Sequence, residues 1–142
     1  MSTNQDNMYE HSTSVRVRYA ETDQMDIVYY GNYAQYFEVG RVESIRALGF
    51  TYKRMEEMGV HMPVVHMDVR YLRPAHYDDL ITIKTTLRNL PLQHEIVFYQ
   101  EVFNEQQKLL TRGKITLFFI NSATGKRTQM PETLRKALEA YF

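Results

Sequence analysis

A long helix with apolar residues on two sides is the feature that most constrains the fold of this sequence. Residues 32–48 predict a helix, because Asn32 is a favourable N-cap and Gly49 suits the C′ position after the last turn. At about 100° per residue, one face collects Tyr33, Tyr36, Phe37, Gly40, Ser44, Ala47 and Leu48, and another side carries Val39, Val42 and Ile45. A helix that is apolar on two sides is expected to be buried on two sides, so the rest of the chain should wrap around it.

Gly40 lies in the middle of this predicted helix, where glycine costs about 1 kcal/mol relative to alanine. We interpret it as a point of close approach, at which a sheet or a partner chain passes the helix backbone. The alternative interpretation is a glycine that is merely tolerated.

Strand-like segments surround the helix. Before it, residues 14–19 alternate valine with arginine, which is the period of a half-buried strand. After it we expect a short helix over 51–58, strands over 62–72, 80–90, 95–103 and 108–121, and a final helix over 131–141. Short turns join the last four strands, which predicts an antiparallel meander. The expected fold class is α+β, with a curved antiparallel sheet wrapped around one long central helix.

Charge and cysteine content restrict the possible functions. The 142 residues include 17 basic and 17 acidic side chains, and this balance argues against non-specific binding to nucleic acid. The absence of cysteine excludes disulfides and thiolate chemistry and fits the reducing cytoplasm. No apolar run is long enough for a membrane span, and the polar N-terminal residues do not resemble a secretory signal. We expect a cytoplasmic protein with a flexible tail over residues 1–12 and one folded domain over 13–142.

The histidines do not predict a metal site. His61 and His66 are five residues apart in or near a predicted strand, so their side chains point to opposite faces. We therefore expect no metal. His66 is a candidate for lining a ligand pocket, and a surface or packed histidine is the alternative.

An acidic turn directly before the long helix carries the strongest functional signal. Asp23 and Asp26 precede the apolar run 27–30, and Gly31 and Asn32 then open the helix. A carboxylate beside a helix N-terminus can act as a base or nucleophile next to backbone N–H groups that stabilise a developing oxyanion. Hydrolysis of an acyl compound is the first hypothesis. The alternative is that both aspartates only shape a turn and cap the helix.

Two sequence blocks resemble a known family. The first contains Glu21–Asp23, Ile27–Tyr33, Phe37–Glu38 and Arg41, and the second contains Val69–Ala75 followed by Asp78–Leu80. Together they resemble the hotdog-fold acyl-CoA thioesterases of the 4-hydroxybenzoyl-CoA thioesterase type, over the chain from Ser14 onwards.

The resemblance implies hydrolysis of an acyl-CoA thioester to a free acid and CoA. Asp23 matches the catalytic carboxylate, and Tyr30 matches the position whose backbone N–H points at the thioester carbonyl, with help from Gly31. Asn32, Tyr33 and His66 are the expected substrate-binding residues. The role of Asp23, as nucleophile or as general base, stays open.

The resemblance also implies an assembly and a cofactor requirement. The family forms dimers whose sheets join edge to edge, often paired again into tetramers, with active sites at the subunit interface. It uses no metal and no cofactor, because CoA is part of the substrate. Basic residues should bind the CoA phosphates, and Arg73, Lys84, Arg88 and Arg112 are candidates, although each also suits a solvated strand position.

The chain departs from the family at two positions. Many members have glycine where Asp26 stands, and we expect Asp26 to tolerate a left-handed turn and to face solvent. A related subgroup has histidine where Tyr30 stands, so only a backbone role remains at that position. The alternative function on the same fold is a non-catalytic module that binds or senses acyl-CoA.

Overall fold

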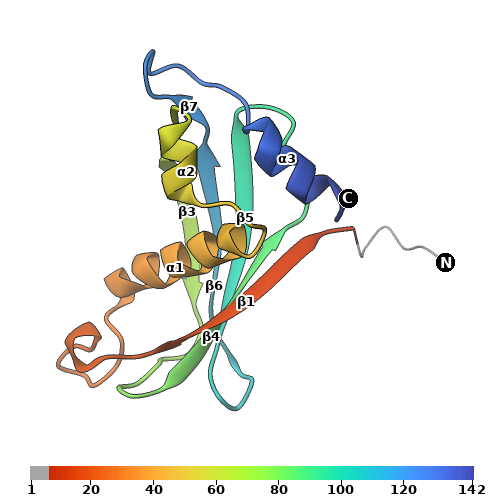
Figure 1. The fold of residues 1–142 in the computed structure, drawn as a ribbon. Helices are drawn as coiled ribbons and strands as arrows, with labels where there is room; N and C mark the ends of the chain where they lie inside the picture. Colours follow the sequence, from red (N-terminus) through yellow and green to blue (C-terminus); the bar gives the residue numbers. More distant parts are fainter. Residues whose placement is uncertain (1–6) are drawn as a thin grey trace.

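A five-stranded antiparallel sheet organises the domain. The computed structural model describes residues 7–142. The sheet contains β1 (Tyr9–Arg16), β3 (Val64–Tyr71), β4 (Leu80–Leu87), β5 (Glu95–Phe103) and β6 (Leu109–Phe118), in the order β1-β4-β5-β6-β3 (Figure 1). A separate two-stranded ribbon pairs β2 (Val60–His61) with β7 (Ile120–Asn121).

One long helix crosses one face of this sheet. It is α1 (Tyr33–Arg46), which follows the short 3-10 helix η3 (Tyr30–Asn32), and Figure 1 shows it lying across the strands. Shorter helices are η2 (Tyr19–Glu21), α2 (Tyr52–Glu57) and α3 (Glu132–Glu139). The expected α+β fold, an antiparallel sheet with one long central helix, is confirmed.

Gly40 marks the closest approach of α1 to the sheet. A Cβ atom at this position would lie 2.6 Å from Ile83 Cγ2 and 2.7 Å from both Gln100 Nε2 and Thr85 Oγ1. Glycine therefore lets the helix backbone approach β4 and β5. The prediction that a sheet passes close to Gly40 is confirmed.

The second apolar side of α1 is only partly buried by this chain. Tyr36, Phe37 and Ile45 are fully or almost fully buried, whereas Val39 is 37% exposed. The expectation that the helix is covered on two sides is therefore met only in part within one chain, because on the second side Ile45 is buried and Val39 is exposed.

Two features of the expected strand arrangement are wrong. Residues 9–12 belong to β1 rather than to a tail, and the strand expected over 14–19 ends at Arg16. Its inward-facing positions include polar residues such as His11 and Thr13, which hide the apolar period. Residues 1–6 of the expected tail lie outside the described residues.

The second correction concerns strand order. The last four large strands do not form one meander, because β3 pairs with β6 at the edge and only β4, β5 and β6 are consecutive. The connection 72–79 makes this possible. It can span roughly 26 Å when extended, whereas the three strand spacings between β3 and β4 amount to about 14 Å.

Two of the three remaining helix-end signals, at Thr51 and Gly49, agree with the structure. Thr51 Oγ1 accepts a hydrogen bond from Arg54 N at 3.0 Å and caps α2, as expected. Gly49 has a φ of +84° after α1. Asn32 stands at the predicted N-cap position, but its side chain makes no capping hydrogen bond.

Candidate active site

Glu21 anchors the loop that leads into α1. Its Oε1 atom accepts hydrogen bonds from Arg18 N at 2.9 Å and from the Tyr36 hydroxyl at 2.8 Å, and its Oε2 atom accepts one from Arg18 Nε at 3.0 Å. Its backbone oxygen accepts from Tyr29 N at 3.0 Å and from Asn32 Nδ2 at 2.8 Å. One buried residue therefore ties the two ends of the loop to each other and to the helix.

The same bonds explain the protonation state of Glu21. Burial alone would raise the pKa of this carboxyl, but the hydrogen bonds from Arg18 and Tyr36 and the charge of Arg18 outweigh it and hold the pKa below its ordinary value of 4.5. Glu21 is thus a fixed negative charge at neutral pH.

Asp23 lies in a tight turn within this loop. Thr22 and Val28 form a β-bridge, and Asp23 N donates to Ile27 O at 2.9 Å. The Asp23 Oδ1 atom accepts a hydrogen bond from Met25 N at 2.8 Å. In the described part of the chain its Oδ2 atom has no donor, so one carboxylate oxygen is free for chemistry.

Asp26 occupies the tip of the same turn and faces solvent. Its φ is +63°, a left-handed conformation that aspartate adopts more readily than most residues. Its side chain is exposed. Both expectations for Asp26, the tolerated left-handed turn and the solvent-facing side chain, are confirmed.

The start of the helical segment offers free backbone donors. The first hydrogen bond of η3 runs from Asn32 N to Tyr29 O at 2.9 Å. The backbone N–H groups of Tyr30 and Gly31 come before this bond, so they have no acceptor within the helix. Among residues 7–142, neither amide donates to a protein acceptor. A Cβ at Gly31 would lie 2.7 Å from the Tyr29 ring, so glycine lets this ring pack on the backbone.

Asp23 and the start of the helix line the same cavity. It has a volume of about 500 Å³, and we call it the Asp23 cavity. Its walls come from the turn, the helix start and the end of β3, and comprise Asp23, Met25, Ile27, Val28, Tyr29, Tyr30, Tyr33, Tyr71, Leu72, Arg73 and Pro74. The lining is mainly apolar and aromatic, with one carboxylate and one guanidinium.

Tyrosine rings form much of this wall. The Tyr30 and Tyr71 rings meet edge to face with centroids 6.1 Å apart, and Tyr71 packs in the same way on Tyr33 at 5.5 Å. The Tyr71 hydroxyl donates to Tyr30 O at 3.3 Å. The pKa of the Tyr29 hydroxyl is raised, mainly by its interaction with Tyr30 and to a smaller extent by the charge of Asp23. The cavity that Asp23 lines therefore has a largely aromatic wall.

The structure brings together some of the predicted site residues. Asp23, Tyr30 and Tyr33 all line the Asp23 cavity. Gly31 and Asn32 adjoin it at the helix start without lining it, and the Asn32 side chain binds the backbone of Glu21 instead.

His66 lies elsewhere. His66 is on β3 and pairs with Thr116 on β6. Because residues two apart in a strand share a face, His66 lies on the same side as Asp68 and Arg70. That side is the face of the sheet away from α1. Within this chain His66 does not reach the Asp23 cavity.

Sequence reasoning missed Glu21 as an anchor and Tyr71 as a wall of the cavity. Glu21 bonds to Tyr36 across 15 positions of sequence, and Tyr71 comes from an edge strand far along the chain. No local pattern marks either role. The role of Glu21 depends on how the loop packs on α1, and the role of Tyr71 depends on how β3 lies beside α1. Of the candidate phosphate ligands, Arg73 lines the cavity, whereas Lys84, Arg88 and Arg112 lie on the outer face of the sheet.

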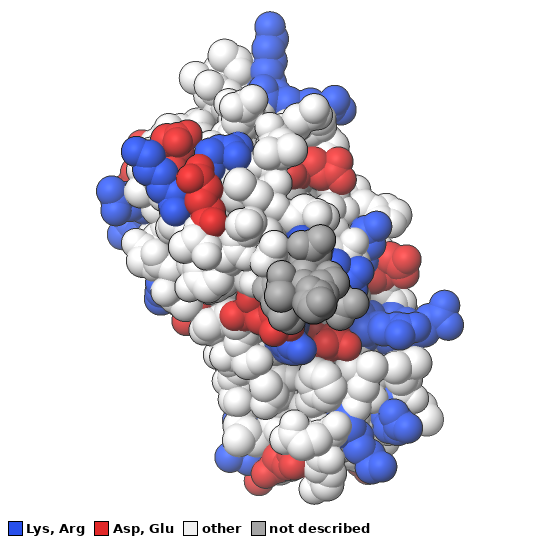
Figure 2. Space-filling view, turned by 90° about the vertical axis from the view of Figure 1, so that its right-hand side faces the viewer, with Lys and Arg blue, Asp and Glu red and all other residues white. Residues whose placement is uncertain are grey.

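Residues 7–142 contain no group of three or more His, Cys, Asp or Glu side chains arranged to hold a metal ion. None of their helices is long and apolar enough to cross a membrane. The view in Figure 2 shows basic and acidic side chains interspersed over one side of the molecule.

Comparisons with known proteins identify the family of this chain. Residues 17–138 match the thioesterase-like superfamily. The chain is 44% identical over 82 residues to the putative acyl-CoA thioesterase YneP of Bacillus subtilis. This alignment covers 58% of this chain and 59% of that protein. The DHNA-CoA thioesterase from Staphylococcus aureus superposes with a TM-score of 0.84 at 36% identity, over 93% of this chain and 88% of the other.

A more distant structure shares the fold alone. A mutant of 4-hydroxybenzoyl CoA thioesterase complexed with 4-hydroxybenzoyl CoA superposes with a TM-score of 0.82 at 17% identity, over 92% of this chain and 99% of the other. The fold and the family match define a hotdog protein of the thioesterase type. The chain belongs to the thioesterase-like superfamily.

Proposed function

We propose that this protein hydrolyses acyl-CoA thioesters to a free acid and CoA. The observation that carries the proposal is the Asp23 cavity, in which a carboxylate with one free oxygen and the start of a helix face the same mainly apolar space. The names of the similar proteins, an acyl-CoA thioesterase and a DHNA-CoA thioesterase, support the same reaction.

Asp23 supplies the attacking group in either of two ways. As a nucleophile, its carboxylate adds to the thioester carbonyl, CoA leaves as a thiolate, and water hydrolyses the resulting anhydride. As a general base, it takes a proton from water, the hydroxide adds to the carbonyl, and CoA leaves as a thiolate. Because a thioester carbonyl is electrophilic and a thiolate leaves readily, neither route requires a metal or a cofactor.

The Tyr30 amide, together with that of Gly31, forms the proposed oxyanion site. Both precede the first hydrogen bond of η3, and the helix dipole adds a partial positive charge at this end. A positioned donor of this kind contributes about 10²- to 10³-fold to turnover in other hydrolases. Asn32 acts indirectly, since its side chain holds Glu21 O and so positions the loop.

The walls of the cavity suggest how substrate binds. Tyr33, Tyr71 and Leu72 supply apolar surface for the acyl group, and Arg73 supplies a positive charge for a CoA phosphate. His66 cannot serve the same chain's cavity from the outer face, so a role in substrate binding would require a partner subunit.

Edge-to-edge dimers through β3 are part of the proposal. β3 is an edge strand of eight residues, and Val64, Val65 and Tyr71 on it are 43%, 45% and 48% exposed. A long apolar edge is prone to pair with another strand. Because Tyr71 also lines the Asp23 cavity, such pairing would place the site at the subunit interface, and two dimers would form a tetramer. The lack of cysteine supports a cytoplasmic location.

Thiol release tests the proposal directly. The full chain is incubated with short, long and aromatic acyl-CoA esters, and free CoA is measured. We expect turnover of at least one class, and Asp23→Asn should lower it roughly a hundredfold or more. The variant keeps the oxygen that accepts from Met25 N, so the turn and the oligomer should persist.

Asp26→Asn is the matched control. It removes the same charge from the same turn, outside the cavity, and asparagine also tolerates a left-handed φ. Its activity should equal that of the wild type. Binding of acyl-CoA without any thiol release would favour the alternative function, a non-catalytic acyl-CoA sensor.

A further inference from the structure

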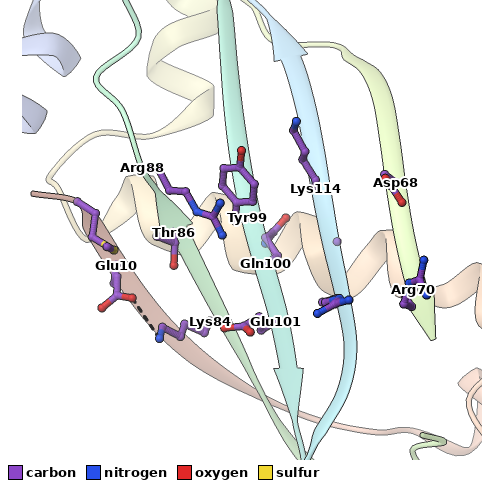
Figure 3. A pocket seen from close by; sticks show the side chains of 13 residues that line it. Glu10, Asp68, Arg70, Lys84, Thr86, Arg88, Tyr99, Gln100, Glu101 and Lys114 are labelled. Carbon is purple, nitrogen blue, oxygen red and sulfur yellow. Dashed lines mark ion pairs between the residues drawn. The ribbon is translucent and has the colours of Figure 1, made fainter. Parts of the chain in front are cut away.

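A second cavity lies on the face of the sheet away from α1. It has a volume of about 550 Å³, and we call it the outer groove. In Figure 3 the charged side chains of this groove lie on the side of the sheet opposite the helix. It shares no residue with the Asp23 cavity, yet both border β3, where Tyr71 lines the Asp23 cavity and its neighbour Arg70 lines the outer groove.

Basic side chains outnumber acidic ones in the outer groove. The cations are Arg70, Lys84, Arg88, Arg112 and Lys114, and the carboxylates are Glu10, Asp68 and Glu101. Lys84 is neutralised by Glu10, with Nζ and Oε2 3.1 Å apart (Figure 3). No other cation of the groove has a carboxylate oxygen within 4.0 Å in residues 7–142. Glu101 stands directly opposite Arg112, and Asp68 stands directly opposite Lys114 in the strand register. The groove therefore keeps a net excess of two cations, five against three carboxylates.

Two arginines face each other across neighbouring strands. Arg70 on β3 is the direct register partner of Arg112 on β6, and Lys114 lies two residues further along the same face. Like charges at directly opposed positions destabilise a sheet. A bound anion between them would convert this repulsion into attraction.

Arg88 adds a flat surface to the groove. Its guanidinium carbon lies 3.6 Å from the centroid of the Tyr99 ring, a stacked cation–π arrangement. Figure 3 shows the two side chains directed toward each other across the groove. The second face of a stacked guanidinium suits a planar ring such as a nucleobase.

We propose that the outer groove is a second ligand site, which binds the diphosphate of a phosphorylated nucleotide at Arg70, Arg112 and Lys114. Guanidinium groups form paired hydrogen bonds with phosphate oxygens, and Lys114 adds a point charge. The cavity has the volume of a small-molecule site. The same chemistry is present in a free nucleotide and in the nucleotide end of CoA, and the experiment separates these two sources.

A second copy of the chain is a less suitable occupant. Two outer grooves placed face to face would each bring an excess of positive charge, so they would repel. Self-association through this face is therefore an outcome that would overturn the proposal.

Direct binding of ATP and of inorganic pyrophosphate to the full chain tests the site by calorimetry, with no dependence on hydrolytic activity. The test variant is Arg70→Gln with Arg112→Gln. The control is Lys126→Gln with Lys136→Gln, which removes two exposed positive charges elsewhere. We expect the test variant to bind both probes about tenfold more weakly or worse, and the control to bind like the wild type.

Thermal unfolding without ligand reports on folding. The double substitution removes the repulsion between Arg70 and Arg112 but also the attraction between Arg112 and Glu101, so the test variant should melt close to the wild-type temperature. If it is unfolded, Lys114→Gln alone repeats the binding test. Failure of the wild type to bind either probe at millimolar concentration, unchanged binding by a folded variant, or a changed oligomeric state would overturn the proposal.

Competition identifies the source of the nucleotide. If CoA displaces ATP, and the test variant raises KM for an acyl-CoA but not for the matching acyl-pantetheine, the ligand is the nucleotide end of CoA. If CoA does not displace ATP and KM is unchanged, the ligand is a free nucleotide. Both results support a diphosphate site in the outer groove.

Discussion

The hydroxyl of Tyr36 donates a hydrogen bond to Oε1 of Glu21 at 2.8 Å, and this bond joins helix α1 to the loop that carries Asp23. Burial and the neighbouring Glu21 carboxylate raise the pKa of Tyr36, so its hydroxyl stays a donor at physiological pH. Glu21 in turn holds Arg18, Tyr29 and Asn32. The position of Asp23 relative to the start of the helix thus depends on a buried pair outside the Asp23 cavity.

Tyr36→Phe removes this bond and keeps the buried ring. Hydrogen bonds to charged groups contribute about 1.5–3 kcal/mol, so we expect a loss of that size in the free energy of unfolding, measured with urea. Thioester hydrolysis should also fall, because the loop is held less firmly. Tyr77→Phe is the control, since Tyr77 is 57% exposed. Unchanged stability of Tyr36→Phe would show that the bond contributes nothing net.

The depressed pKa of Glu21 predicts a specific pH dependence of stability. A carboxyl whose pKa is lower in the folded state stabilises the fold fully above its ordinary value of 4.5, and that contribution is lost as the pH falls through the folded-state pKa. Glu21→Gln lacks this contribution at every pH. The difference in unfolding free energy between wild type and Glu21→Gln should therefore be largest at pH 6–7 and shrink toward acid, as urea titrations at several pH values would show. A constant difference down to acid pH would contradict the assignment.

Local signals predicted the elements of the fold better than their arrangement. The strand over 95–103 was placed correctly, and so were the Thr51 cap and the sheet approach at Gly40. Each of these features depends either on residues that are adjacent in sequence or on the unfavourable helix propensity of a single residue. The place of β3 at the far edge was missed, because the segment 72–79 can reach either neighbour and only packing around α1 selects between them.

The site was predictable to the extent that it is continuous in sequence. Asp23, Tyr30 and Tyr33 lie within one short segment, and the structure places all three on one cavity. A substrate-binding role of His66 stays a prediction, because the face on which its side chain lies depends on strand register, which no local pattern fixes. Its register partner is Thr116, which puts it with Asp68 and Arg70 on the outer face.

Gly40→Ala should destabilise the protein despite a better helix propensity. Alanine gains about 1 kcal/mol in an exposed helix, but here its Cβ would lie 2.6–2.7 Å from atoms of Ile83, Thr85 and Gln100. Overpacking of this kind typically costs about 1–3 kcal/mol or more, so the net effect in a urea titration should be a loss. Ala34→Gly on the exposed side of the same helix tests propensity alone and should cost about 1 kcal/mol. A stabilised Gly40→Ala would mean that α1 can move away from the sheet.

Val65→Lys tests the role of the β3 edge. Val65 is 45% exposed on the edge strand, so lysine there should leave the fold of one chain intact while its charge blocks pairing with a second edge. We expect the wild type to elute from size exclusion as a dimer or tetramer and Val65→Lys as a smaller species. Hydrolysis should fall together with assembly, because Tyr71 at the end of the same strand lines the Asp23 cavity. Val39→Lys places the same charge at a 37% exposed valine on helix α1 and should leave the β3 edge free to pair. A fully active monomeric Val65→Lys variant would show that the cavity works within a single chain.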